Sequence, residues 1–192
     1  MALVEAAVVV YLRALSPAPG PLTAIHTVLP DHILAVEVLR EAATIVMLLA
    51  VAVLAGRGAW TRFLSFCLAF GVWDVLYYLW LRVFTGWPTS LLSWDVLFLI
   101  PVPWVAPVLA PLIVSACLIA GSLWLRDRPT LGWPAWAGSC AGAALILAAF
   151  TVDARAALVE AEPRPFRWWL FGAGVAAGLA GLIVTAKRWR TA

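Results

Sequence analysis

Long apolar runs separated by short polar loops organise this 192-residue chain. Four of the runs carry few polar interruptions and cover residues 32–56, 60–84, 133–151 and 168–186. A helix needs roughly 20 mostly apolar residues to cross the hydrocarbon core of a bilayer. Each run therefore predicts one transmembrane helix.

A fifth apolar run, residues 96–125, differs from the others because prolines interrupt it at Pro101, Pro103, Pro107 and Pro111. Each proline removes a backbone donor and tends to kink or break a helix. We therefore predict a Pro-broken third span that is irregular at its start and regularly helical after Pro111.

The N-terminal residues 1–30 form a separate short segment. Its apolar stretch ends at the Pro-rich sequence Ser16–Pro21 and is short for a span. Glu5 stands where a signal peptide would carry Lys or Arg, so cleavage is not expected. We predict a short interfacial or re-entrant helix here, with a sixth span as the alternative.

Composition places the whole chain in the membrane. Hydrophobic residues make up 65% of it and charged residues 12%, and the mean hydropathy is +0.99. Soluble domains carry about a quarter charged residues, so an ordinary soluble domain is excluded. The prediction is an all-α, polytopic helical membrane protein of about five transmembrane helices, forming a single integral membrane domain over residues 1–192.

Basic residues at the ends of the apolar runs predict the orientation. One side of the membrane receives seven of them: Arg57, Arg62, Arg126, Arg128, Lys187, Arg188 and Arg190. The other side receives fewer basic residues, namely Arg82, Arg155, Arg164 and Arg167. It also carries most of the acidic loop residues: Asp95, Asp153, Glu160 and Glu162. The positive-inside rule then predicts a plasma-membrane protein with a cytoplasmic C-terminus and an extracytoplasmic start of the first span. Because the basic residues form no continuous run, no nucleic-acid partner is expected.

Ionisable side chains inside the first two runs are the strongest functional signal. The first run contains Glu37, Arg40 and Glu41, and the second contains Asp74 followed by Tyr77, Tyr78 and Arg82. Charges in hydrocarbon are unfavourable by several kcal/mol unless they are paired or hydrated, so such residues are functional candidates. At 1.5 Å per residue, Arg40 and Glu41 lie about 12 Å, and Asp74 about 15 Å, from the outer helix ends.

Antiparallel packing of the first two helices would then pair Arg40 with Asp74 and Glu37 with Arg82. Glu41 remains as the acid without an assigned cation. A buried carboxyl without a cation favours its neutral form, which is the property of a proton carrier or general acid.

The irregular start of the third span is expected at the same depth, because such backbone is tolerated where it lines a cavity. It brings Asp95 and Trp104 to the other polar residues. The predicted binding site is therefore an outward-facing pocket formed by Glu37, Arg40, Glu41, Asp74, Tyr77, Tyr78, Arg82, Asp95 and Trp104.

The leading functional hypothesis is a pocket that binds or conducts a proton, a cation or a small polar solute. One alternative is a non-catalytic membrane subunit or assembly factor that docks a partner through its charged helix faces. Another is a membrane enzyme acting on a lipid or isoprenoid substrate, with Asp74 and Glu41 as acid and base. The charges would be purely structural if they only fixed the helix register.

Other chemistry is not indicated by the sequence. No dinucleotide, phosphate-loop or zinc-protease motif is present, and His32 and Glu37 point about 140° apart on a helix. We therefore expect no metal and no cofactor, and assign no catalytic residue. Partners expected besides the lipid bilayer are a second copy of the chain or another membrane protein, because the chain is small and lacks the inverted halves of a complete transporter.

Small residues predict how the last two helices pack. Gly138 and Gly142 lie four residues apart in one run, and Gly174 and Gly178 lie four apart in the next. Such spacing allows two helix backbones to approach closely. We predict that these two helices pack together, with a dimer contact as the alternative.

Overall fold

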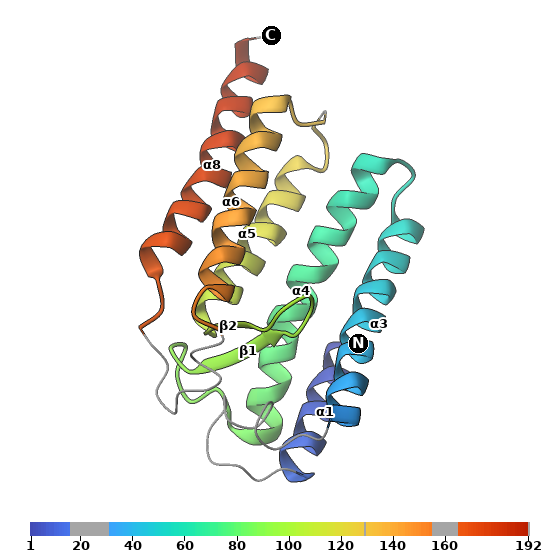
Figure 1. The fold of residues 1–192 in the computed structure, drawn as a ribbon. Helices are drawn as coiled ribbons and strands as arrows, with labels where there is room; N and C mark the ends of the chain where they lie inside the picture. The colour runs from blue at the N-terminus through green and yellow to red at the C-terminus, as the bar shows by residue number, and fades with distance from the viewer. Residues whose placement is uncertain (16–30, 129, 155–164, 192) are drawn as a thin grey trace.

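The computed structural model describes residues 1–15, 31–128, 130–154 and 165–191, and it is a bundle of helices with one small β-hairpin (Figure 1). The elements follow the chain in this order: α1 (Ala2–Leu15), α3 (Asp31–Ala55), α4 (Ala59–Thr85), β1 (Trp94–Phe98), β2 (Trp104–Pro107), α5 (Leu109–Leu125), α6 (Trp133–Thr151) and α8 (Trp168–Thr191). Several features discussed above lie outside the described residues: Ser16–Pro21, Arg155, Glu160, Glu162 and Arg164.

Four helices are long and apolar enough to cross a membrane, namely α3, α4, α6 and α8. Their bounds agree closely with the four uninterrupted apolar runs, and α5 adds a shorter apolar helix. The prediction of an all-α helical membrane protein is confirmed. The helix periodicity and the length of the apolar runs were sufficient for this, because lipid leaves backbone groups no hydrogen-bonding partner outside the helix.

The segment over residues 96–125 starts without a helix and continues as a regular helix, as predicted, but its first part is a β-hairpin that the sequence did not predict. Residues 94–107 form an antiparallel hairpin in which Asp95 lies opposite Ala106 and Val96 opposite Val105. Pro101 and Pro103 fall between the two strands, where no ladder donor is needed. The regular helix, α5, begins at Leu109 with Pro111 in its first turn, where a missing N–H is tolerated.

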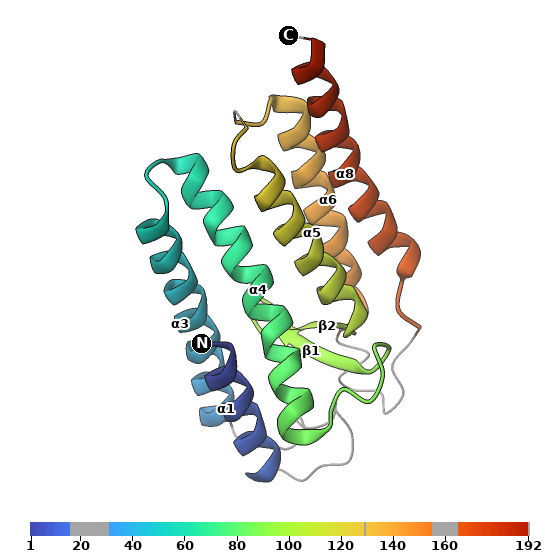
Figure 2. The same ribbon diagram turned by 180° about the vertical axis from the view of Figure 1, so that it is seen from behind.

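The short N-terminal helix is confirmed as α1. Its 14 residues are fewer than the roughly 20 needed to cross a bilayer, and residues 16–30 lie outside the described ranges. It lies beside α4 and the start of α3 in both views (Figures 1 and 2). Ala2, Glu5 and Ala6 are buried in this contact. The helix therefore packs into the bundle and carries a carboxylate toward α3.

Helices α6 and α8 pack along a seam of small residues, as predicted. A Cβ atom added to Gly142 would lie 2.5 Å from the Gly174 carbonyl oxygen, and one added to Gly174 would lie 2.8 Å from the Gly142 carbonyl oxygen. Both glycines are therefore used for a close backbone approach within one chain. The small-residue motif that was the basis for the dimer alternative is thus occupied by the α6–α8 contact.

The hairpin is held against the α5–α6–α8 side of the bundle by a core of apolar side chains. Ala106 of β2 and Ala110 of α5 pack with three residues of α6 and α8, namely Ala149, Phe150 and Phe171. In Figure 2 the hairpin lies at the same end of the molecule as α1 and the start of α3. This placement brings β1 close to the charged turns of α3.

Candidate functional site

A polar cavity of about 100 Å³ lies where α1, α3, α4 and β1 meet. It contains seven of the nine residues predicted for the pocket: Glu37, Arg40, Glu41, Asp74, Tyr77, Tyr78 and Asp95. The other lining residues include Glu5 and Arg13 of α1, Trp73 of α4, and Val96 to Leu99 of the hairpin. A cavity of this size has room for several water molecules or one small ion.

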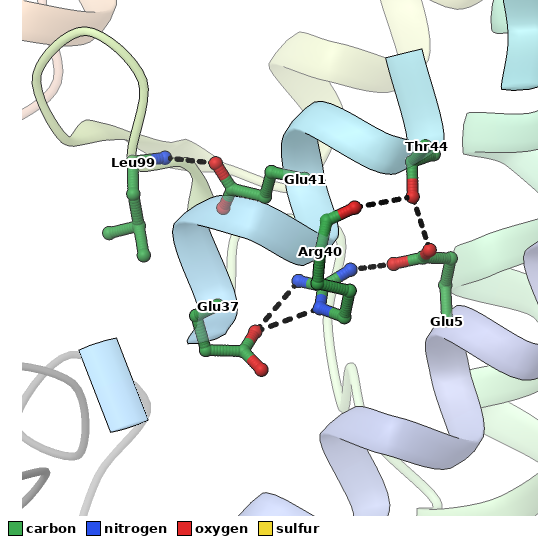
Figure 3. A network of polar contacts seen from close by, with 6 residues as sticks. All are labelled: Glu5, Glu37, Arg40, Glu41, Thr44 and Leu99. Atoms are coloured by element: carbon green, nitrogen blue, oxygen red, sulfur yellow. Dashed lines mark hydrogen bonds and ion pairs between the residues drawn. The ribbon is translucent and has the colours of Figure 1, made fainter. Parts of the chain in front are cut away.

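Arg40 stands at the centre of an ion-pair network that joins α1 to α3 (Figure 3). Its guanidinium pairs with the Glu5 carboxylate of α1. It also donates from Nε and Nη2 to Glu37 Oε2, both at 2.9 Å. The Thr44 hydroxyl bonds to Glu5 and to the Arg40 carbonyl oxygen. One cation, Arg40, therefore forms ion pairs with two acids, Glu5 and Glu37.

Glu41 points away from this network, toward the hairpin (Figure 3). Its Oε2 accepts a hydrogen bond from the Leu99 backbone N–H at 2.8 Å. The residue is only 7% exposed. The segment between β1 and β2 thus supplies a backbone donor to a buried acid, which a regular transmembrane helix in this position would not do.

Asp74 and Asp95 also receive neutral hydrogen-bond donors. Ser115 Oγ of α5 donates to Asp74 Oδ2 at 2.7 Å, and Tyr78 Oη donates to Asp95 Oδ2 at 3.0 Å. Gly71, one turn before Asp74, allows this approach, because a Cβ there would lie 2.8 Å from the Ser115 carbonyl oxygen. Both acids are buried.

The predicted ion pairs are wrong. Arg40 pairs with Glu5 and Glu37 in place of Asp74, because α1 brings a carboxylate to the same level of α3. Arg82 does not reach Glu37. It lies at the end of α4 and donates to the carbonyl oxygens of Gly86 and Pro88, at 2.9 Å for the latter.

Trp104 also lies outside the cavity, contrary to the prediction. Its ring packs against Phe98 at 5.4 Å and Phe150 at 6.4 Å between centroids, on the side of the hairpin that faces α6. The prediction assumed a broken helix, whereas in the hairpin Trp104 lies opposite Phe98, which lines the cavity, and its own ring packs toward Phe150 of α6. Glu41 was expected to lack a cation, and no ion pair reaches it in the described part of the chain.

Sequence reasoning missed Glu5, Arg13, Trp73 and Ser115. Glu5 had a usable signal, because it is an acid within an apolar helix like Glu37 and Glu41. Ser115 had none, since small hydroxyl residues are common in membrane helices. Trp73 presents a buried indole N–H without a hydrogen-bond partner among the described residues, and its ring stacks on Tyr77 at 6.1 Å.

The cavity is acidic. Five carboxylates line it, against the two guanidinium groups of Arg13 and Arg40. Within the described ranges, three of these acids form no ion pair: Glu41, Asp74 and Asp95. Burial raises the pKa of Asp95, in the hairpin, to about 7, although the positive charge of Arg13 and the Tyr78 hydrogen bond lower it. These acids give the site groups that can take up and release protons, although the described residues include no set of three or more His, Cys, Asp or Glu side chains placed to hold a metal ion.

Comparison with protein-family models, curated proteins and solved structures finds no match to this chain.

Proposed function

We propose that this membrane protein binds or conducts a proton or small cation through the polar cavity between α1, α3, α4 and the hairpin. One observation carries the proposal. Three buried acids, Glu41, Asp74 and Asp95, face one small cavity, and the described residues supply them with neutral hydrogen-bond donors but no ion pair. Buried charges are normally paired or coordinate an ion, so such a set favours a mobile positive charge as the missing partner.

The surroundings also favour a cation over an anion. The single arginine at the centre of the cavity is already occupied by Glu5 and Glu37. Aromatic rings of Trp73 and Tyr77 form another wall, and the faces of such rings attract positive charge. A negatively charged solute would meet an excess of carboxylates. A small polar solute remains compatible with the site only if it is neutral or cationic.

In this proposal Glu41 is the exchange site. It lies between the Arg40 network and the hairpin, and its contact with Leu99 is a single backbone hydrogen bond. Such a bond can persist while the other carboxylate oxygen takes up or releases a proton or ion. Asp74 and Asp95 would stabilise the positive charge from the opposite wall.

We further propose that the cavity opens to the outside of the plasma membrane and that the C-terminus is cytoplasmic. The basic residues Arg57, Arg126 and Arg128 all lie at the helix ends opposite the cavity, which supports this orientation. Reporter fusions after Gly86 and after Arg126 test it. An extracytoplasmic reporter at Arg126 would reverse the direction of access.

Because the chain is small, a complete path would need a second copy or a partner membrane protein, which crosslinking in membranes would detect.

The test of the function is ion flux in proteoliposomes. Purified protein is reconstituted, and an internal pH-sensitive dye is followed after imposed proton, sodium and potassium gradients. Glu41→Gln retains shape and hydrogen bonding but removes the ionisable group, so it should abolish the flux. The matched control is Asp127→Asn, an exposed acid at the other end of the bundle, which should leave the flux unchanged.

Binding is measured in parallel, because a binding protein need not conduct. Isothermal titration with sodium, potassium and ammonium salts at fixed ionic strength should show uptake that Glu41→Gln removes. If the wild type neither conducts nor binds, or if Glu41→Gln behaves as wild type in both assays, the proposed ion function is wrong.

A further inference from the structure

A second cavity, of about 450 Å³, lies at the opposite end of the bundle from the polar site. It is bordered by the end of α3, the α3–α4 turn, the first part of α4 and the last part of α5, and its lining residues include Arg57, Thr61, Leu64, Ser65, Leu68 and Arg126. None of these residues belongs to the site described above. The proposed ion function leaves this cavity unexplained.

The cavity has a charged rim and a mainly apolar interior, in which Ser65 and Ser122 contribute hydroxyl groups. Arg57 and Arg126 lie at the helix ends, which is the level of lipid headgroups for spanning helices. Leu68 lies about 10 Å further along α4 than Thr61. Leu64 and Leu68 line this deeper part of the cavity. Polarity therefore falls with depth, as it does along a phospholipid.

The rim is rich in unused hydrogen-bond donors. Neither Arg57 nor Arg126 has a hydrogen-bond or ion-pair partner in the part of the chain that the structure describes. The start of α4 adds backbone donors, because its N-cap residue, Gly58, has no side chain to cap the first turn. Thr61 Oγ1 is bonded only to the backbone of Gly58. Two arginines beside an open helix N-terminus form a strong site for a phosphate group.

We infer that this cavity binds the phosphate group of an anionic phospholipid, with Arg57 and Arg126 holding the headgroup and the leucines contacting an acyl chain. A soluble phosphate would explain the rim alone. The apolar interior between two membrane helices favours the lipid, because it would otherwise remain an unfilled gap beside the bilayer. This inference is independent of the proposed ion function.

Native mass spectrometry of the detergent-purified protein tests the inference. Phosphatidylglycerol and phosphatidylcholine of equal chain length are titrated, and the apparent dissociation constant of the first bound lipid is compared. The wild type should prefer phosphatidylglycerol. Each arginine near a charged membrane surface contributes about a fivefold change in affinity, so Arg57→Gln with Arg126→Gln should weaken phosphatidylglycerol binding by about 30-fold.

Two further variants separate the site from general charge. Arg128→Gln removes the same charge at the same end of the molecule but lies outside the cavity, so it should leave the preference intact. Ser65→Phe fills the cavity without changing charge and should weaken binding of the lipid. A third arm adds inorganic phosphate, which should not compete with the lipid at equal concentration.

Three results would overturn the inference. The first is equal affinity of the wild type for the two lipids. The second is an equal loss of binding in Arg128→Gln and the double variant, since this would reflect net charge alone. The third is full competition by inorganic phosphate, which would make this a site for a soluble anion.

Discussion

The Ser115 hydroxyl donates a hydrogen bond of 2.7 Å to the Asp74 carboxylate and thereby joins the middle of α5 to the middle of α4. Both side chains are buried, with Ser115 only 1% exposed. Gly71 permits the contact by leaving room for the α5 backbone. Because Asp74 has no ion-pair partner among the described residues, this bond is the main protein contact that stabilises its charged form.

Replacing Ser115 with alanine should destabilise the protein by about 1–3 kcal/mol, because it leaves a buried acceptor without its donor. The free energy of unfolding in detergent, followed by circular dichroism, measures this. Asp74→Asn should change the effect of Ser115→Ala, since the two residues form one bond. Additive effects of the two substitutions would show that the bond contributes nothing to stability.

The sequence was sufficient for the four long apolar helices and for most of the residues that line the cavity. Glu37, Arg40, Glu41 and Asp74 were recognisable because a charge is exceptional within an apolar run. The partners were not recognisable. They depend on where α1 lies and on a hairpin whose local sequence also fits a broken helix, and both are set by packing between distant segments.

Arg40 should contribute more to stability than an ordinary surface arginine does. Arg40→Gln leaves Glu5 and Glu37 buried without their cation, and such a loss is typically about 3 kcal/mol or more. The Arg40 side chain is 24% exposed, so we expect a loss close to about 3 kcal/mol and not a larger one. Combining Arg40→Gln with Glu5→Gln should restore part of the lost free energy of unfolding.

The pair of Arg167 and Asp153 provides the comparison. Its members are joined at 2.6 Å but are 40% and 21% exposed. Arg167→Gln should therefore reduce the free energy of unfolding much less than Arg40→Gln does, because solvent screens an exposed pair. Equal effects of Arg40→Gln and Arg167→Gln would contradict the central role of the buried network.

Glycine at position 142 should be essential to the α6–α8 seam. Gly142→Ala places a methyl group 2.5 Å from the Gly174 carbonyl oxygen, so the two backbones must separate. Overpacking of this kind is unfavourable by about 1–3 kcal/mol. Gly178→Ala is the matched control in the same seam, because its added methyl meets nothing within 4 Å. Thermal unfolding should show a lower midpoint for the first variant only.

Asp95 should make the free energy of unfolding fall as pH rises, which is the opposite of the effect of a carboxyl group whose pKa is lowered by folding. Its pKa rises from an ordinary 3.8 to about 7 in the folded protein, with burial as the largest cause. Between these two values the folded state binds more protons than the unfolded state does, so the free energy of unfolding falls as pH rises. The stabilisation is complete below about pH 4 and is lost as pH rises through about 7, with a slope of at most about 1.4 kcal/mol per pH unit.

Thermal unfolding of wild type and Asp95→Asn between pH 4 and pH 9 measures this contribution, with Asp127→Asn as the control for an exposed acid. The wild-type midpoint should fall relative to Asp95→Asn as pH rises through this window. The neighbouring charges have opposite effects, since Arg13 lowers the pKa of Asp95 and Asp74 raises it. Arg13→Gln should therefore move the upper end of the window to higher pH. Parallel curves for wild type and Asp95→Asn would show that Asp95 titrates alike in the folded and unfolded states, which would contradict a raised pKa of this buried carboxyl.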